Sequence, residues 1–232
     1  EPLAALLPRE VPQAESAEPG ASAGGAFGAT LLEWAEIERE IEQLAHEIVT
    51  SSFGTAARKY ISDRRAFRFV TAQAATSLDI TASFCAPLGG LRAGLSALLG
   101  AMPPRSCRRV VLGVAASLDQ LLWAGMLRSA PCSEAGGGQL AHDMRALVGL
   151  FAPFSSRPHT LLRHVHEACL LLILPRPERT ALLAEIGELA TLGADHAPAA
   201  LAALQTQLEA LQVFRLGPAE VKDVLSNLQV DD

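Results

Sequence analysis

Apolar residues return every three or four positions along most of the chain, with polar residues between them. This period holds from about residue 30 to residue 228 and is typical of successive amphipathic helices, and no stretch shows the alternation of a strand. The first helix is predicted from about Thr30 to Ile61. Five apolar residues at i, i+3, i+7, i+10 and i+14 predict a seam against a partner helix: Trp34, Ile37, Ile41, Leu44 and Ile48. A solvated face is predicted on the opposite side: Glu36, Arg39, Glu40 and Glu47.

Two further apolar stretches follow this helix. The first, about Ala72–Leu99, is predicted to be kinked or split by Pro87 and the Gly89–Gly90 pair. Pro103 and Pro104 then end it. The second, about Ser106–Arg128, is apolar nearly all round, which predicts a helix at the centre of the bundle.

Prolines and glycines divide the remaining sequence into five more predicted helices. A loop is expected at Pro131–Gly138. The helices are expected to start near Gln139, at Pro158, at Pro177, at Pro198 and at Pro218. Their inward residues are predicted as Leu140, Met144, Leu147 and Phe151, then Leu161, Val165, Ala168 and Leu172, then Leu182, Ile186 and Leu189, then Leu201, Leu204, Leu208 and Leu211.

These elements predict an all-α fold, an elongated stack of about eight antiparallel helices. Apolar residues make up 50% of the 232 and aromatic residues only 5%, so leucine and alanine carry a core suited to helix packing. Residues 1–28 are rich in Pro, Ala, Gly and Glu without a period, and are predicted to be a disordered linker or loop. Residues 29–232 form the predicted helical domain.

The charge pattern bears on partners. A net charge of −6 gives no global basic field, so nucleic acid is not an expected partner. Two basic clusters stand out against it: Arg58, Lys59, Arg64, Arg65 and Arg68, and then Arg105, Arg108 and Arg109. Either they are solvated faces, or they touch acidic partners or weakly contact an anionic membrane surface. Phe67 and Phe69 indicate that some of the first cluster is packed.

The cysteines and the most apolar segment bear on the compartment. Cys85, Cys107, Cys132 and Cys169 are far apart, which favours reduced, mostly buried thiols over a disulfide framework or a zinc site. Residues 110–127 are long enough to be considered as a membrane span, but Asp119 and Gln120 stand in the middle of them. A central core helix is therefore the favoured interpretation.

No set of residues predicts catalysis, a metal or a cofactor. His164 and His166 are two positions apart on one helix and point in different directions, and His159 adds no helical zinc spacing. Gly136–Gly138 lacks the context of a phosphate loop and is expected to allow a tight turn. Ser155, Ser156 and Cys132 have no nearby histidine with an orienting acid. We expect no enzyme activity and no small-molecule substrate.

The linear order of several segments resembles a known family. FGTAARKYISDRR (53–65) closes a long helix, and VVLGVAASLDQLLWAGML (110–127) contains the Leu118–Asp119 pair. GGQLAHDMRALVGLFAPFSSRPHTLLRHVHEACLLLILP (137–175) and the closing FRLGPAEVKDVLSNL (214–228) come after them. Together they resemble the C-terminal region of the Rint/Tip-type subunit of the Dsl (in animals, NRZ) vesicle-tethering complex, over roughly residues 30–228.

The resemblance implies a helical-rod domain of the CATCHR type over residues 29–232, without enzymatic activity. It implies a peripheral protein at the cytoplasmic side of the endoplasmic reticulum that acts in Golgi-to-ER retrograde transport. The implied partners are other tether subunits and ER SNAREs. A rival hypothesis is a ligand-binding or regulatory domain with an enclosed apolar pocket, lined by the Gly- and Ala-rich residues 78–126.

Overall fold

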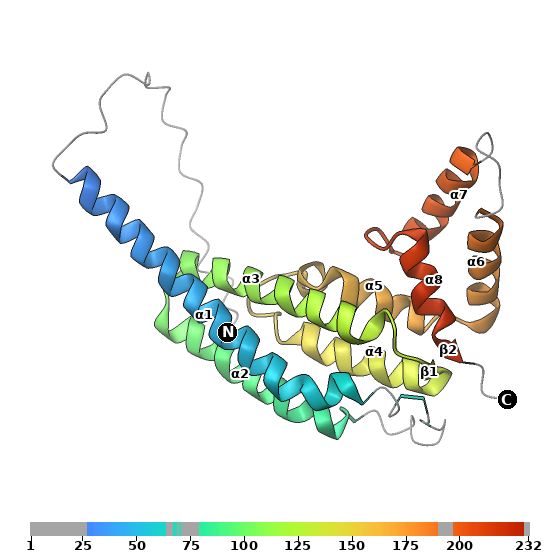
Figure 1. Ribbon diagram of the computed structural model, residues 1–232, viewed down its shortest axis with the longest axis horizontal. Coiled ribbons are helices and arrows are strands. Elements are labelled where there is room, and N and C mark those ends of the chain that lie inside the picture. The colour runs from blue at the N-terminus through green and yellow to red at the C-terminus, as the bar shows by residue number, and fades with distance from the viewer. Residues whose placement is uncertain (1–26, 64–66, 69, 71–78, 190–196, 230–232) are drawn as a thin grey trace. The chain divides into compact units, whose positions relative to one another are not determined.

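The computed structural model describes residues 27–63, 67, 68, 70, 79–189 and 197–229. These residues contain eight α-helices, a π-helical turn, a short 3₁₀-helix and two strands (Figure 1). The α-helices are α1 (Gly28–Ser62), α2 (Ala82–Ala101), α3 (Pro104–Leu122), α4 (Glu134–Gly149), α5 (Arg163–Leu172), α6 (Arg176–Leu189), α7 (Ala197–Ala210) and α8 (Pro218–Ser226). The all-α fold class is therefore confirmed, and the elongated arrangement stays a prediction.

The chain divides into two compact units, Glu1–Glu38 and Arg39–Asp232. In the first unit the structure describes the opening turns of α1, in which residues 29–38 are mostly exposed. The predicted linker over residues 1–28 lies outside the described residues except for its last two positions. The second unit holds the rest of α1 and the seven other α-helices that the described residues form.

Within the second unit, α1 buries one face through aromatic and small residues. Its buried side chains are Val49, Phe53, Ala57 and Tyr60. The rings of Phe53 and Phe84 of α2 meet edge to face with centroids 6.3 Å apart, and Tyr60 stacks on Phe84 at 4.1 Å. Such contacts between rings add specific geometry to the burial of apolar area. The C-terminal half of α1 is therefore anchored in the core.

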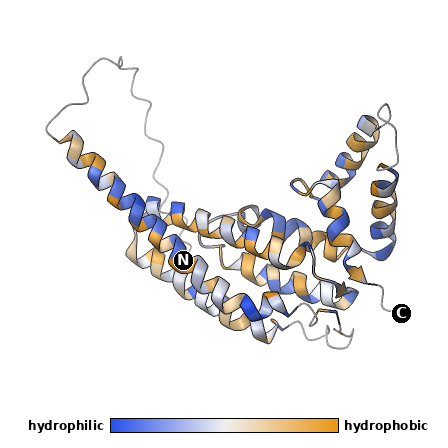
Figure 2. Cartoon of the chain, viewed as in Figure 1, coloured by the Kyte–Doolittle hydropathy of each residue, from blue (hydrophilic) through white to orange (hydrophobic). Residues whose placement is uncertain are grey.

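The apolar seam predicted on α1 is not the face that α1 buries. Its five residues are 45–65% exposed: Trp34, Ile37, Ile41, Leu44 and Ile48. The prediction that they pack against another helix of this chain is wrong for the described residues. Periodicity shows which faces of a helix are apolar, and α1 has two; the second, beginning at Val49, is the one that meets α2. Figure 2 shows apolar and polar residues alternating along α1.

The helix predicted at the centre of the bundle contributes one face to the core. α3 has nine buried residues, among them Val114 and Leu118, and contacts α2 and α5. Its other face is exposed, with Leu112 44% and Leu121 37% exposed, so the prediction that this helix is surrounded by others is wrong. Pro104 occupies its first turn, where a missing N–H costs nothing. The last turn is wider than expected, because Trp123–Leu127 form a π-helical turn.

The prolines of α2 and α3 act differently. Pro103 and Pro104 separate the two helices as predicted. Pro87 lies inside α2 and is buried, but α2 runs unbroken from Ala82 to Ala101, so the predicted split is wrong. Pro87 stands in the second turn, where it removes one hydrogen bond near the start of the helix while its ring adds to the core. Residues 71–78 lie outside the described residues.

The C-terminal helices follow the predicted pattern. The inward residues predicted for the fourth helix are all at most 1% exposed, although Phe151 lies in the turn after α4: Leu140, Met144, Leu147 and Phe151. The fifth predicted helix begins as a 3₁₀-helix, Pro158–Leu161, and continues as α5 after Leu162. Val165, Ala168, Leu182 and Leu204 are buried, as predicted for their stripes. Leu161, Leu189, Leu201 and Leu211 are only partly buried.

The segment predicted as the loop Pro131–Gly138 is mostly ordered structure. Cys132–Ser133 form strand β1, which pairs in parallel with β2 (Leu228–Gln229) in the register Cys132 to Leu228. α4 then begins at Glu134, five residues before the predicted start, with Ser133 as its cap. Two residues per strand leave no room for an alternating pattern, so the sequence carries no signal for this pair.

In the part of the chain that the structure describes, two helices are long and apolar enough to be considered as membrane spans: residues 82–101 and residues 104–127. In the second, 56% of the apolar window is buried inside the protein. Asp119, in its middle, is buried and bonded to another helix. These contacts are those of a core helix of a packed bundle, as predicted for this segment.

Candidate partner-binding surface

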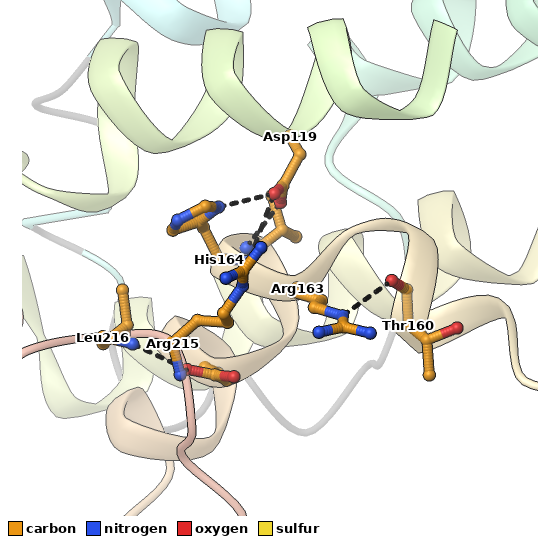
Figure 3. Close-up of polar contacts among 8 residues, drawn as sticks. Asp119, Thr160, Arg163, His164, Arg215 and Leu216 are labelled. Atoms are coloured by element: carbon orange, nitrogen blue, oxygen red, sulfur yellow. Dashed lines mark hydrogen bonds and ion pairs between the residues drawn. The ribbon is translucent and has the colours of Figure 1, made fainter. Parts of the chain in front are cut away.

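Buried carboxylates join separate segments of the chain by hydrogen bonds. The carboxylate of Asp119, on α3, lies at the start of α5 (Figure 3). Its Oδ1 accepts the backbone N–H of Val165 at 2.9 Å, and its Oδ2 accepts that of His164 at 3.3 Å. Nδ1 of His164 lies 2.7 Å from the same oxygen. Because Leu162 offers no capping side chain, Asp119 caps α5 from a different helix.

Glu167, on α5, has the same role toward a different segment. It is 4% exposed, and its Oε2 accepts the backbone N–H groups of Arg215 and Leu216 at 2.8 and 3.0 Å. These amides belong to the segment that leads into α8. A carboxylate that accepts two N–H donors is well satisfied in the interior, so Glu167 fixes that segment onto α5.

Asp143, on α4, completes the set and is fully buried. It accepts the hydroxyl of Tyr60 at 2.8 Å, the backbone N–H of Thr81 at 3.0 Å and the side-chain amide of Gln139 at 3.1 Å. Burial first, and then the charge of Asp143, hold the pKa of Tyr60 well above its usual value. Asp143 thereby ties α1 and the start of α2 to α4.

Each of these carboxylates joins two segments of the chain by hydrogen bonds. The other polar residues considered from the sequence do not gather at one site. His164 contacts Asp119, whereas His159 and His166 lie together with ring centroids 5.0 Å apart. Among the described residues no three His, Cys, Asp or Glu side chains gather as metal ligands would. Cys132 is buried, and burial raises its pKa to about 11.

A small pocket adjoins the pair formed by His159 and His166. It has a volume of about 370 Å³ and is lined by His159, Thr160, Arg163, His166, Glu167, Gln212 and Phe214. Gln212 has a positive φ of 62°, and Phe214 is 68% exposed at the rim. Burial, then the neighbouring His159, lower the pKa of His166. Oε2 of Glu167 accepts two backbone amides there.

The cysteines and the basic clusters fall largely as predicted. All four thiols are free, with Cys85 exposed and the other three buried. In the first basic cluster Arg58, Lys59 and Arg68 are exposed, and Arg64 and Arg65 lie outside the described residues. Phe67 is 2% exposed and packs edge to face on Tyr60 at 5.5 Å, which confirms the packing predicted for that stretch. In the second cluster Arg109 is bonded to Glu42 through Nε at 2.9 Å.

An open groove lies between α1 and α3. It has a volume of about 670 Å³. Its lining is mostly apolar or small: Leu44, Glu47, Ile48, Thr50, Ser51, Gly54, Ser117, Leu118 and Leu121. Leu44 and Ile48 of the predicted seam form one wall, and Leu121 of α3, 37% exposed, forms the other. Glu47 lies at the groove, not opposite the seam as predicted.

Next to the groove, a polar contact and small residues allow α1 to lie close to α3. His46 Nε2 lies 2.9 Å from Ser117 Oγ, and the imidazole packs at 3.2 Å from where a Cβ on Gly113 would stand. A Cβ on Gly54 would meet the Leu121 side chain at 3.8 Å, an ordinary contact. The sequence marked Leu44 and Ile48 but missed Gly54, Ser117 and Leu121, which a search for small residues facing an apolar stripe could have suggested.

The apolar residues between positions 78 and 126, which motivated the hypothesis of an enclosed ligand pocket, are used elsewhere. Phe84, Leu91, Val114 and Leu118 are at most 2% exposed and belong to the common core. The groove that Leu118 also touches opens to the surface. The apolar surface of this segment therefore supports packing within the protein and along an external face.

Helix-in-groove recognition lays the apolar face of an amphipathic helix into an apolar groove. The model of the RINT-1/TIP-1 family matches residues 8–227, and the chain therefore belongs to the RINT-1/TIP-1 family. This confirms the resemblance found in the sequence, and it indicates a subunit of a tethering complex, whose partners are other subunits of that complex. No curated protein and no solved structure matches the chain.

Proposed function

We propose that this chain is a non-enzymatic domain of a vesicle-tethering subunit that acts in Golgi-to-ER retrograde transport by binding SNAREs or partner subunits. The observation that carries the proposal is the family match over residues 8–227, joined to an open apolar groove in a bundle whose buried acids join separate segments by hydrogen bonds. A bundle whose segments are joined by such hydrogen bonds offers a rigid surface, which lowers the entropy cost of binding.

The proposed location is the cytoplasmic face of the endoplasmic reticulum, where the chain is peripheral. Partner binding supplies the attachment, and weak contact of exposed arginines such as Arg105 and Arg108 with anionic lipid adds to it. Vesicles with and without phosphatidylserine separate the two contributions. Sedimentation of the chain with anionic vesicles alone, lost at high salt, supports the lipid contact, and no sedimentation with either vesicle removes it from the proposal.

The test of the proposed function is affinity capture from cells with the full chain as bait, read by mass spectrometry. ER SNAREs and other tether subunits are the expected proteins, and each is then checked as a purified partner. Purified candidates that fail to bind at concentrations of tens of micromolar overturn the proposed role for this chain. The variant Ile48→Ser tests the groove, because Ile48 lines it and is 60% exposed, so that the change leaves the core intact and is expected to weaken binding of the purified partner.

A further inference from the structure

We infer that the groove between α1 and α3 binds an amphipathic helix of a partner protein whose apolar ridge is flanked by lysine or arginine. This inference deepens the proposed function and rests on it, because it names the surface and the chemistry of the partner. The residues that carry it belong to the second unit alone: Ile41, Leu44, Ile48, Leu121 and the acids beside them.

The apolar residues of this surface are exposed. Ile41, Leu44 and Ile48 are 54%, 59% and 60% exposed, and they stand at i, i+3 and i+7 on one side of α1. Leu121 of α3 lines the same groove as Ile48. Scattered single apolar residues need no explanation, but an apolar ridge beside a groove is a recognised place for a second helix.

The form of the groove suits large side chains from such a helix. Beyond Ile48 the wall of α1 becomes small, with Ser51 and Gly54, and Ser117 lines the groove from α3. Three small residues together leave the space that a leucine or a phenylalanine of the partner would fill. Helix pairs place apolar knobs of one helix into holes of the other in this way.

The charge beside the ridge decides the kind of partner. Glu40 and Glu47 each precede an apolar residue of the ridge by one position, so they stand one heptad apart along its edge and both are exposed. Glu42 is bonded to Arg109 and serves to hold α1 on α3. In paired helices the residues flanking the apolar seam select the partner by charge. Two acids there favour lysine or arginine in the facing positions.

The same acids disfavour the two other occupants of an apolar groove. A second copy of this chain would bring Glu40 and Glu47 toward their own equivalents, and like charges in those positions are destabilising. An anionic membrane would be repelled by them. Two of the basic residues of α1, Arg58 and Lys59, lie beyond Gly54. A third, Arg39, stands two positions before Ile41 and so points about 200° away from the ridge. The requirement for positive charge therefore applies to the half of the partner over Glu40 and Glu47.

The experiment uses the full chain and two designed helical peptides as probes, with binding followed by fluorescence anisotropy. Both peptides carry the same leucine and isoleucine ridge. In one, lysines flank the ridge in the half that faces Glu40 and Glu47, and in the other glutamates stand at the same positions. We expect the lysine peptide to bind at least about tenfold more tightly, with a preference that weakens in salt.

Variants locate the binding. Gly54→Leu fills the groove and is expected to weaken binding of the lysine peptide by about tenfold or more. Gly54→Ala adds one methyl at an ordinary contact distance and is expected to preserve this binding. Glu40→Lys with Glu47→Lys is expected to reverse the preference between the peptides. Leu99→Ser, at an exposed apolar residue of α2, is the matched control and leaves binding unchanged.

Several outcomes overturn the inference. Equal binding of both peptides would show that the surface does not select its partner by charge. Undiminished binding by Gly54→Leu would show that the peptide does not bind in the groove. A concentration-dependent dimer that Ile48→Ser abolishes assigns the surface to a second copy, and capture by anionic vesicles that Ile48→Ser abolishes assigns it to lipid. If these tests fail while purified tether subunits or SNAREs still bind, the proposed function stands and this surface is not its site. If the peptide tests succeed and those partners do not bind, the surface stands and the proposed function fails.

Discussion

The backbone of Gly136 lies directly against the carbonyl of Phe67. A Cβ on Gly136 would come within 1.8 Å of the Phe67 oxygen, which is inside any permissible contact. The approach is fixed by a hydrogen bond from the backbone N–H of Ser133 to the same oxygen at 3.0 Å. Ser133 also caps α4 by accepting the N–H of Gly136 at 3.0 Å. The start of α4 is thereby docked on the backbone of Phe67.

This contact predicts that Gly136→Ala destabilises the chain strongly. The displaced carbonyl belongs to backbone and cannot rotate aside, so the free energy of unfolding is expected to fall by about 3 kcal/mol. Gly138→Ala is the matched control, since nothing lies within 4 Å of its Cβ position, and a helical Gly-to-Ala change stabilises by roughly 0.5–1 kcal/mol. Urea denaturation of both variants measures the difference. Equal stabilities would show that the close contact at Gly136 is not formed.

The structure gives a different reason for the glycines at 136–138 from the one that the sequence suggested. They were expected to allow a tight turn before the fourth helix, but they lie in its first turns, and no described glycine has a positive φ. Gly136 is needed because another stretch of backbone approaches it. That requirement depends on Phe67, nearly seventy positions away, and no local pattern can show it.

Asp119 capping α5 leads to a second prediction. Asp119→Ala leaves the N–H groups of His164 and Val165 without an acceptor, and the expected loss is about 2–3 kcal/mol of unfolding free energy. Asp119→Asn keeps one acceptor oxygen and is expected to lose about 1 kcal/mol. Denaturant midpoints compare the two with Gln120→Ala, an exposed neighbour. A loss for Asp119→Ala no larger than for Gln120→Ala would contradict the capping role.

The sequence predicts the helices well and their cross-links poorly, for a physical reason. Apolar periodicity and proline positions report local structure, and they placed α3 and α8 close to their observed bounds. Asp143 and Glu167 stand at positions that read as ordinary polar residues of helices. Their burial depends on which backbone amides of distant segments lack partners in the folded chain. That is decided by packing, and periodicity does not report it.

The exposed apolar stripe of α1 is also predicted only in part by the sequence. The stripe that contains Ile41 and Leu44 is evident in the sequence, but whether this chain covers it is not. A second stripe on α1, from Val49 through Phe53 and Ala57, competes for the same neighbours and buries aromatic rings. Its aromatic side chains remove more apolar area from water, which explains why α1 turns that face inward.

The bond between Tyr60 and Asp143 yields a third prediction. Tyr60→Phe keeps the ring stacked on Phe84 and removes one hydrogen bond to a charged group, for an expected loss of about 1.5–3 kcal/mol. Asp143→Ala is expected to cost more, about 3–5 kcal/mol, because the Tyr60 hydroxyl and the Thr81 amide are both left unpaired. Thermal and urea denaturation give both values. A smaller loss for Asp143→Ala than for Tyr60→Phe would refute this account of the network.

The four thiols are expected to differ sharply in reactivity. Cys85 is exposed, whereas burial raises the pKa of Cys132 to about 11 and that of Cys169 to about 12. The reactive species is the thiolate, so at neutral pH one thiol should react quickly with Ellman's reagent and the rest only after unfolding. Cys85→Ser is expected to abolish the fast reaction. A fast phase that survives this change would mean that a buried cysteine is accessible.

The pocket at His166 predicts a dependence of stability on pH. Burial, and then the charge of His159, lower the pKa of His166, although Glu167 opposes this and Arg163 also lines the pocket. As pH falls through about 6.5, the unfolded chain gains a proton that the folded chain does not bind until its lower pKa is reached. Stability that is present above that window is therefore lost as pH falls through it.

The test for His166 compares denaturation of the parent and of His166→Asn across this range. The parent is expected to lose stability on acidification by more than the variant does, because the variant has no proton to gain at that position. His159→Asn removes the neighbouring imidazole, so it is expected to shift the pKa of His166 some of the way back, as an NMR titration of its ring would show. Identical pH dependence in the parent and in His166→Asn would mean that His166 titrates alike in the folded and unfolded chains, contrary to its burial beside His159.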